Sequence, residues 1–124
     1  YGAKIAYENK LHSSPTLDGL DLVYKRTMEK VLKFRHPTGH FLITVDDALY
    51  CAQYLQAWIF EAQLRSKLEE KFGKEWFNNP KTGEFLKKLW ANGQKYNVVE
   101  LAQQLGFPGL NIKPLLANVI ERLG

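Results

Sequence analysis

The chain has 124 residues and a net charge of +4, from 17 basic and 13 acidic residues. This length suits one domain that buries a core, and 45% hydrophobic with 24% charged residues exclude a globally disordered chain. Because the basic excess is small and interspersed with acidic residues, it predicts a solvated surface and no nucleic-acid partner.

The first third of the chain predicts two helices. Gly2–Leu11 favours a short helix, which the segment Ser13–Pro15 ends. A second helix, capped by Asp18 or Thr16, is expected to run to about Phe34, because its apolar residues recur with a period near 3.6.

The segment His40–Val45 (HFLITV) is rich in β-branched and aromatic residues, as a strand would be. No second strand is predicted to pair with it, and a lone strand leaves its backbone groups unsatisfied. We therefore expect an extended or turn segment that lies on the core.

The longest element is expected over Asp46–Phe72. Asp46 or Thr44 is suited to cap its first turn, and Gly73 is suited to end it. Its first half, Ala48–Ala62, is apolar nearly all round, which predicts a helix that is buried on most sides. Its second half is amphipathic.

Shorter helices complete the chain, the first of them over Thr82–Trp90. Asn97 and Glu100 match a capping box at the start of the next helix. Pro114 favours the first turn of the last helix, where a missing amide proton costs little. The sequence thus predicts an all-α fold: a single helical domain of five to six helices over residues 1–124, with one long central helix and no substantial sheet.

No signal peptide and no stretch of roughly 20 apolar residues is present, so no membrane partner is predicted. The single cysteine, Cys51, excludes an intrachain disulfide and fits a reducing compartment, and we expect a cytoplasmic protein. Because the chain begins at Tyr1 and not at Met, it is interpreted as a fragment of a longer protein.

The histidines do not predict a metal site. His12, His36 and His40 are not in an H-E-x-x-H arrangement, in which two imidazoles one helical turn apart bind zinc. His36 and His40 are four residues apart, but Pro37 and Gly39 between them prevent a helix. Neither a metal ligand nor a catalytic residue is predicted within this chain.

Two further residues with reactive or charged groups have structural interpretations. Cys51 is interpreted as a small core residue, because a nucleophilic thiol needs a nearby base and a lowered pKa. Glu61 lies in an apolar stretch, and Arg65, four residues later, is its expected partner in an ion pair.

Aromatic residues recur every four positions at Tyr50, Tyr54 and Trp58, which places them on one stripe of a helix. Such a stripe is usually part of a core. A buried tyrosine hydroxyl needs a partner, however, and two neighbouring hydroxyls can instead line a groove and donate hydrogen bonds to a peptide or an oxyanion. The residues alone leave both interpretations open.

The run YCAQYLQAWIFEA begins at Tyr50. Downstream of this run, four segments follow in order: Gly93–Tyr96, the expected helix Asn97–Leu105, Gly106–Phe107 and Leu110–Pro114. With these motifs, the segment 46–116 resembles the C-terminal region of the oligopeptidase F and thimet-oligopeptidase group of zinc metallopeptidases, and more closely a divergent bacterial branch of peptidase-like proteins.

The resemblance implies an almost all-helical clamshell with a deep channel, in which zinc is bound by H-E-x-x-H and a downstream glutamate. It also implies substrate-binding roles for Tyr50 and Tyr54, which match the family's first two tyrosines. Ala57 departs from the pattern where many members have a further tyrosine, and Val45 stands near the position of the family histidine. His40 would replace that histidine only if the HFLITV segment folds back.

The leading hypothesis is a C-terminal helical domain of a zinc metallopeptidase-like protein, which forms part of the wall of a peptide-binding channel and is not catalytic alone. Tyr50, Tyr54 and His40 would face a peptide substrate. Zinc would lie in an upstream peptidase domain of the same parent chain. The alternative is a helical protein–protein interaction module, in which the aromatic stripe with Trp76, Phe77 and Trp90 forms the docking surface.

Overall fold

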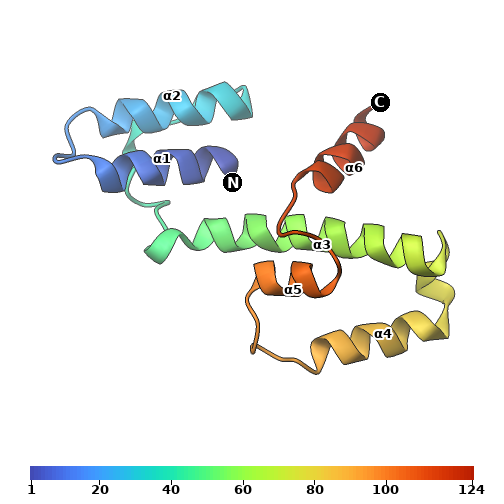
Figure 1. The fold of residues 1–124 in the computed structure, drawn as a ribbon. Coiled ribbons are helices and arrows are strands. Elements are labelled where there is room, and N and C mark those ends of the chain that lie inside the picture. Colours follow the sequence, from blue (N-terminus) through green and yellow to red (C-terminus); the bar gives the residue numbers. More distant parts are fainter. The chain divides into compact units, whose positions relative to one another are not determined.

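The computed structural model describes all residues from 1 to 124 and contains six α-helices and no strand, which confirms the predicted all-α fold with one long helix (Figure 1). The chain divides into two compact units, an N-terminal unit (Tyr1–Leu55) and a C-terminal unit (Gln56–Gly124). The α-helices are α1 (Gly2–Ser13), α2 (Leu20–Leu32), α3 (Tyr50–Phe72), α4 (Pro80–Trp90), α5 (Val98–Gln104) and α6 (Lys113–Leu123). None of these helices combines the length and the apolar character needed to cross a membrane.

The core of the N-terminal unit lies between α1 and α2, which run side by side in opposite directions (Figure 1). Tyr7 and Tyr24 are each only 1% exposed, and their rings meet edge to face with centroids 4.9 Å apart. Both phenols find partners, as buried phenols require. The Tyr7 hydroxyl donates to the Phe41 carbonyl at 2.8 Å, and the Thr44 hydroxyl donates to the Tyr24 oxygen at 3.2 Å.

Helix α2 starts without the predicted side-chain cap. Gly19 occupies the N-cap position with φ +71°, a conformation that glycine adopts readily. Neither Asp18 nor Thr16 therefore caps the helix. The helix ends at Leu32, slightly earlier than expected. Lys33 then adopts a left-handed conformation, and its amide donates to the Glu29 carbonyl.

The HFLITV segment is a series of turns and not an extended strand. A short 3-10 turn covers Thr38–His40, and the Thr44 amide donates to the His40 carbonyl at 3.3 Å. With no partner strand available, the segment satisfies its backbone groups locally. Ile43 is 78% exposed, so this part of the segment does not lie on the core.

Helix α3 begins at Tyr50, later than the predicted start at Asp46. Ala48 and Leu49 have φ of +51° and +56°, in the left-handed region that a right-handed helix cannot include. The Asp46 side chain makes no capping hydrogen bond, because it is paired with Lys4. The sequence contains no glycine here that would have predicted this break.

The C-terminal unit contains most of α3 together with α4, α5 and α6. The predicted capping box at the start of α5 is confirmed: the Asn97 side chain accepts from the Glu100 amide at 3.0 Å, and the Glu100 carboxylate accepts from the Asn97 amide at 2.8 Å. The predicted pair of Glu61 and Arg65 is also present, on the exposed side of α3.

Gln63 on α3 holds a distant loop of the C-terminal unit in place. It is fully buried, and its amide group donates to the Gly109 carbonyl at 3.0 Å and accepts from the Asn111 amide at 2.9 Å. The two bonds satisfy backbone groups that lie between α5 and α6. The neighbouring fully or nearly fully buried apolar residues of this unit are Ala62, Leu68, Ala102 and Leu105.

Candidate substrate-binding site

Tyr50 and Tyr54 lie side by side at the start of α3. Their rings meet edge to face with centroids 5.1 Å apart, and the residues are 49% and 44% exposed. Trp58, the third member of the stripe, is 46% exposed. The interpretation of this stripe as core is therefore wrong, and so is the expectation that the first half of the helix is buried on most sides. This exposure is compatible with the groove interpretation and also with a docking surface.

The Tyr54 hydroxyl stays in its neutral form at physiological pH. A hydrogen bond with the Tyr50 hydroxyl, and the charge that Tyr50 would carry if ionised, raise the pKa of Tyr54 above its ordinary value of 10.0. At any pH below its pKa the Tyr54 hydroxyl keeps its proton, so this hydroxyl remains able to donate a hydrogen bond as well as to accept one.

Tyr54 also lines a pocket of about 310 Å³ within the N-terminal unit. Its apolar wall comes from α1 and α2, and the Lys4–Asp46 ion pair stands at its edge. The Tyr1 ring lies near Tyr54, with centroids 5.6 Å apart. The lining residues are Tyr1, Ala3, Lys4, Met28, Val31, Leu32, Asp46 and Tyr54.

Lys4 connects α1 to the segment that leads into α3. Its ammonium lies 2.6 Å from the Asp46 carboxylate and 3.7 Å from the Glu8 carboxylate. Partial burial alone would lower the pKa of Lys4, but the hydrogen bond and charge of Asp46, with the charge of Glu8, outweigh it and raise the pKa above 10.5. Because the folded pKa is the higher one, this stabilisation is present below about pH 10.5 and is lost only at more alkaline pH.

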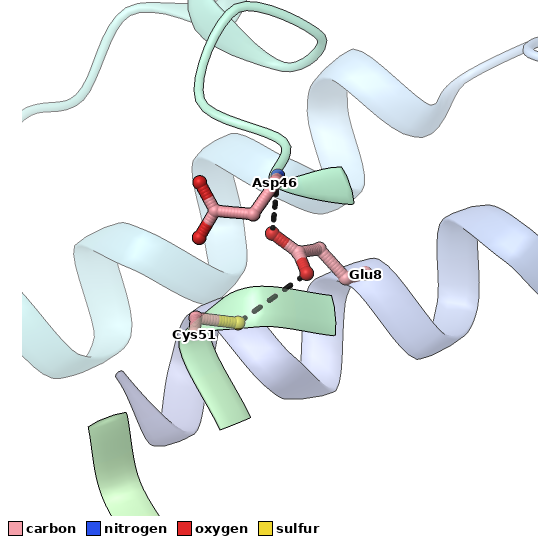
Figure 2. A group of neighbouring side chains, drawn as sticks. All are labelled: Glu8, Asp46 and Cys51. Atoms are coloured by element: carbon pink, nitrogen blue, oxygen red, sulfur yellow. Dashed lines mark hydrogen bonds between the residues drawn. The ribbon is translucent and has the colours of Figure 1, made fainter. Parts of the chain in front are cut away.

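Glu8 is the centre of a partly buried group, here called the Glu8 junction, that comprises Lys4, Glu8, Asp46 and Cys51. The Glu8 side chain is fully buried, and its two carboxylate oxygens accept from the Asp46 amide at 3.2 Å and from the Cys51 thiol at 3.3 Å. Figure 2 shows Glu8 reaching from α1 between the loop and the first turn of α3. Since Cys51 follows Tyr50 directly, the junction fixes the part of α3 that carries the tyrosines.

The Glu8 junction also brings together three potential metal ligands. One atom from each of Glu8, Asp46 and Cys51 lies within 4.8 Å of the others, and carboxylates and thiolates bind zinc. Here, however, the Lys4 ammonium already supplies a positive charge to both carboxylates, and the Cys51 thiol donates a hydrogen bond to Glu8. These residues therefore fit an ion-paired junction and not the zinc site that the resemblance implies, which needs histidines from H-E-x-x-H.

Cys51 is predicted to be unreactive in the folded protein. Burial, reinforced by the hydrogen bond and charge of Glu8, raises the pKa of the Cys51 thiol above 9.0, so the nucleophilic thiolate is scarce at neutral pH. We expect it to react with a disulfide reagent at least ~100-fold more slowly in buffer than in denaturant, because reaction requires local opening. Absorbance stopped-flow measures both rates. Equal rates would contradict the buried junction.

The ring contacts of His40 involve a different group of aromatic residues from the pair of Tyr50 and Tyr54. Its ring meets that of His36, with centroids 6.1 Å apart, and His36 in turn meets Tyr24 at 5.1 Å. The structure thus brings Tyr50 and Tyr54 together, whereas His40 joins a different aromatic group. The role of His40 in substrate binding stays a prediction.

The sequence reasoning did not single out Lys4 or Glu8. Their spacing of four residues, with opposite charges, is a signal for a helical ion pair. This spacing does not predict that Glu8 is buried, because the other partners of Glu8, Asp46 and Cys51, lie 38 and 43 residues away in the sequence.

No family model, curated protein or solved structure matches this chain. The resemblance to zinc oligopeptidases therefore stays a prediction, carried by the motifs that begin at Tyr50.

Proposed function

We propose that this chain is a helical domain of a zinc metallopeptidase-like protein and that it forms part of the wall of a peptide-binding channel. The observation that carries the proposal is the open pair of phenols beside an apolar pocket: Tyr50 and Tyr54 are about half exposed, and Tyr54 lines the pocket. Sites for small ligands combine such apolar walls with a few directed polar groups.

The two tyrosines can bind a peptide carbonyl as a pair. Their hydroxyls are hydrogen-bonded to each other, so one of the two protons is used within the pair and the other remains available for a ligand. Tyr50 and Tyr54 are therefore suited to donate one hydrogen bond to a carbonyl of an extended peptide.

Hydrolysis is assigned to another part of the parent protein. This chain has no H-E-x-x-H motif, and the Glu8 junction does not fit a zinc site. In such enzymes, bound zinc polarises the scissile carbonyl and activates water. In this proposal, the present chain contributes binding and orientation through Tyr50, Tyr54 and, if the segment before α3 rearranges, His40. Its single free thiol fits a cytoplasmic location.

The test is peptide binding to the purified chain. Replacing Tyr50 and Tyr54 together with phenylalanine is expected to weaken the binding of blocked peptides about 5- to 10-fold, because the hydrogen bond lost to the peptide costs about 1 kcal/mol or slightly more. NMR titration measures the dissociation constants, and it reports which residues shift. Phenylalanine keeps the ring packing, so the fold is expected to be retained.

The control variant is Tyr96→Phe, which removes a tyrosine hydroxyl from the C-terminal unit and should leave the affinity unchanged. Zinc added to the wild-type chain should produce no cleavage of the bound peptide, since the zinc motif is absent. Unchanged binding in the double variant, or zinc-dependent cleavage by this chain alone, would contradict the proposal.

The alternative of a protein-interaction module is supported by exposed aromatic residues of the C-terminal unit. Phe77 and Trp90 are 63% and 66% exposed. Isolated exposed apolar residues are common on protein surfaces, however, and do not by themselves indicate a docking site. The pocket lined by Tyr54 favours the channel wall over this alternative.

A further inference from the structure

The pocket beside Tyr54 has a wall that is apolar on the side formed by α2. Met28, Val31 and Leu32 line it, and Ala3 of α1 contributes a small side chain that leaves the space open. Val31 and Leu32 are 58% and 45% exposed, so part of their apolar surface faces outward at this position. A volume of about 310 Å³ lies at the lower end of small-ligand pockets, which suits a side chain and not a large cofactor.

The charged groups at the edge of this pocket neutralise one another. The Lys4 ammonium and the Asp46 carboxylate are 2.6 Å apart, a distance typical of a charge-assisted hydrogen bond. Neither charge is therefore available to attract a charged ligand without breaking this pair. A lysine, arginine, aspartate or glutamate side chain placed in the pocket would lose its water and gain no partner, which is costly.

We propose that this pocket is a specificity subsite that receives one large apolar side chain of the bound peptide, such as leucine or phenylalanine. The inference rests on the proposed function, since it assigns the side-chain selectivity of the same site. The occupant is defined by the apolar wall, the neutralised edge and the position of Tyr54, which belongs to both the pocket and the hydroxyl pair.

The geometry of an extended peptide is compatible with a single such side chain. Successive side chains of a strand point to opposite sides, so an extended peptide that is held by the hydroxyl pair directs alternate side chains toward the wall. The residue whose carbonyl is bound by Tyr54, or its immediate neighbour, is then the one that enters the pocket. Selectivity is expected at one peptide position and not along the whole peptide.

The experiment uses acetylated and amidated heptapeptides that differ only at the central residue: leucine, phenylalanine, alanine, lysine or glutamate. NMR titration of the full chain gives each dissociation constant. We expect the leucine and phenylalanine peptides to bind about tenfold more tightly than the alanine peptide, as is typical of apolar pockets. The lysine and glutamate peptides should bind no more tightly than the alanine peptide.

Two variants and a matched control test the pocket itself. Val31→Glu introduces a charge into the wall at an exposed position, and Ala3→Phe fills the space without adding a charge. Both should abolish the preference for leucine over alanine. Leu22→Glu makes a comparable change on α2, at a residue that is 48% exposed and does not line the pocket, and it should retain the preference.

The outcomes separate the two proposals. If all peptides bind equally, or if Val31→Glu and Ala3→Phe keep the preference, the subsite is refuted. The channel wall then still stands, provided that the double phenylalanine variant of Tyr50 and Tyr54 weakens every peptide. If no peptide binds to the chain, both proposals fail. A preference for leucine and phenylalanine that both pocket variants remove supports the subsite.

Discussion

Replacing Glu8 with alanine is expected to lower the free energy of unfolding by about 3 kcal/mol, because it removes one side of a buried ion-paired group. The Asp46 amide and the Cys51 thiol would lose their acceptor, and Lys4 would lose one of its two carboxylate partners. Urea unfolding followed by far-UV circular dichroism measures the change. Glu8→Gln, which keeps the shape and one acceptor oxygen, should cost less than Glu8→Ala.

The matched control is Glu61→Ala on α3. Glu61 is likewise paired with a basic residue four positions away, but its side chain is 54% exposed, and exposed pairs contribute little to stability. All three tryptophans lie in the C-terminal unit, so tryptophan fluorescence tests whether the effect of Glu8→Ala is confined to the N-terminal unit. Equal small effects for Glu8→Ala and Glu61→Ala would show that the Glu8 junction is not a stabilising centre.

Replacing Gln63 with leucine is expected to lower the free energy of unfolding of the C-terminal unit by about 3 kcal/mol. Leucine has nearly the same size, but it leaves the Gly109 carbonyl and the Asn111 amide without their partner, and each unsatisfied buried group costs about 1–3 kcal/mol. Tryptophan fluorescence during urea unfolding reports on this unit directly, since Trp58, Trp76 and Trp90 all belong to it.

In the variant Gln63→Glu, the stability of the C-terminal unit is expected to depend on pH. Its carboxylate would still accept from the Asn111 amide, but its second oxygen would face the Gly109 carbonyl, so the buried group would favour the protonated form. A carboxyl whose folded pKa is raised gains stability as pH falls. The variant should therefore be least stable at neutral pH and recover toward acid pH.

The control for both Gln63 variants is Gln103→Leu. Gln103 is exposed, and its only side-chain hydrogen bond, to the Pro108 carbonyl, is long at 3.5 Å. Its replacement should change stability by less than about 0.5 kcal/mol, as is usual for surface positions. A comparable loss of stability in Gln103→Leu would mean that replacing any side-chain amide near this loop is destabilising, so the effect could not be attributed to the two hydrogen bonds of Gln63.

The features that the sequence predicted correctly depend on partners close in the chain. The capping box of Asn97 and Glu100 spans three residues, and the pair of Glu61 and Arg65 spans four. Helical geometry alone fixes such distances, so spacing and residue type are sufficient to predict them.

The features that it missed depend on partners far apart in the chain. The bond from Cys51 to Glu8 spans 43 residues, and the bond from Gln63 to Gly109 spans 46. Packing of separate elements creates both, and no local pattern encodes it. The same limit applies to the tyrosine stripe: helical periodicity placed Tyr50 and Tyr54 on one side of α3, but only the neighbouring elements decide whether that side is covered.

The abrupt start of α3 has a consequence for how the tyrosines respond to a ligand. Ala48 and Leu49 are held in a conformation that costs roughly 1–2 kcal/mol each for residues with a Cβ, and such backbone persists only where its surroundings impose it. Glu8 accepts hydrogen bonds on both sides of these two residues, from the Asp46 amide and from the Cys51 thiol. The first turn of α3 is therefore held next to strained backbone, and we expect Glu8 on α1, which lies outside the proposed peptide site, to determine how rigidly Tyr50 is positioned.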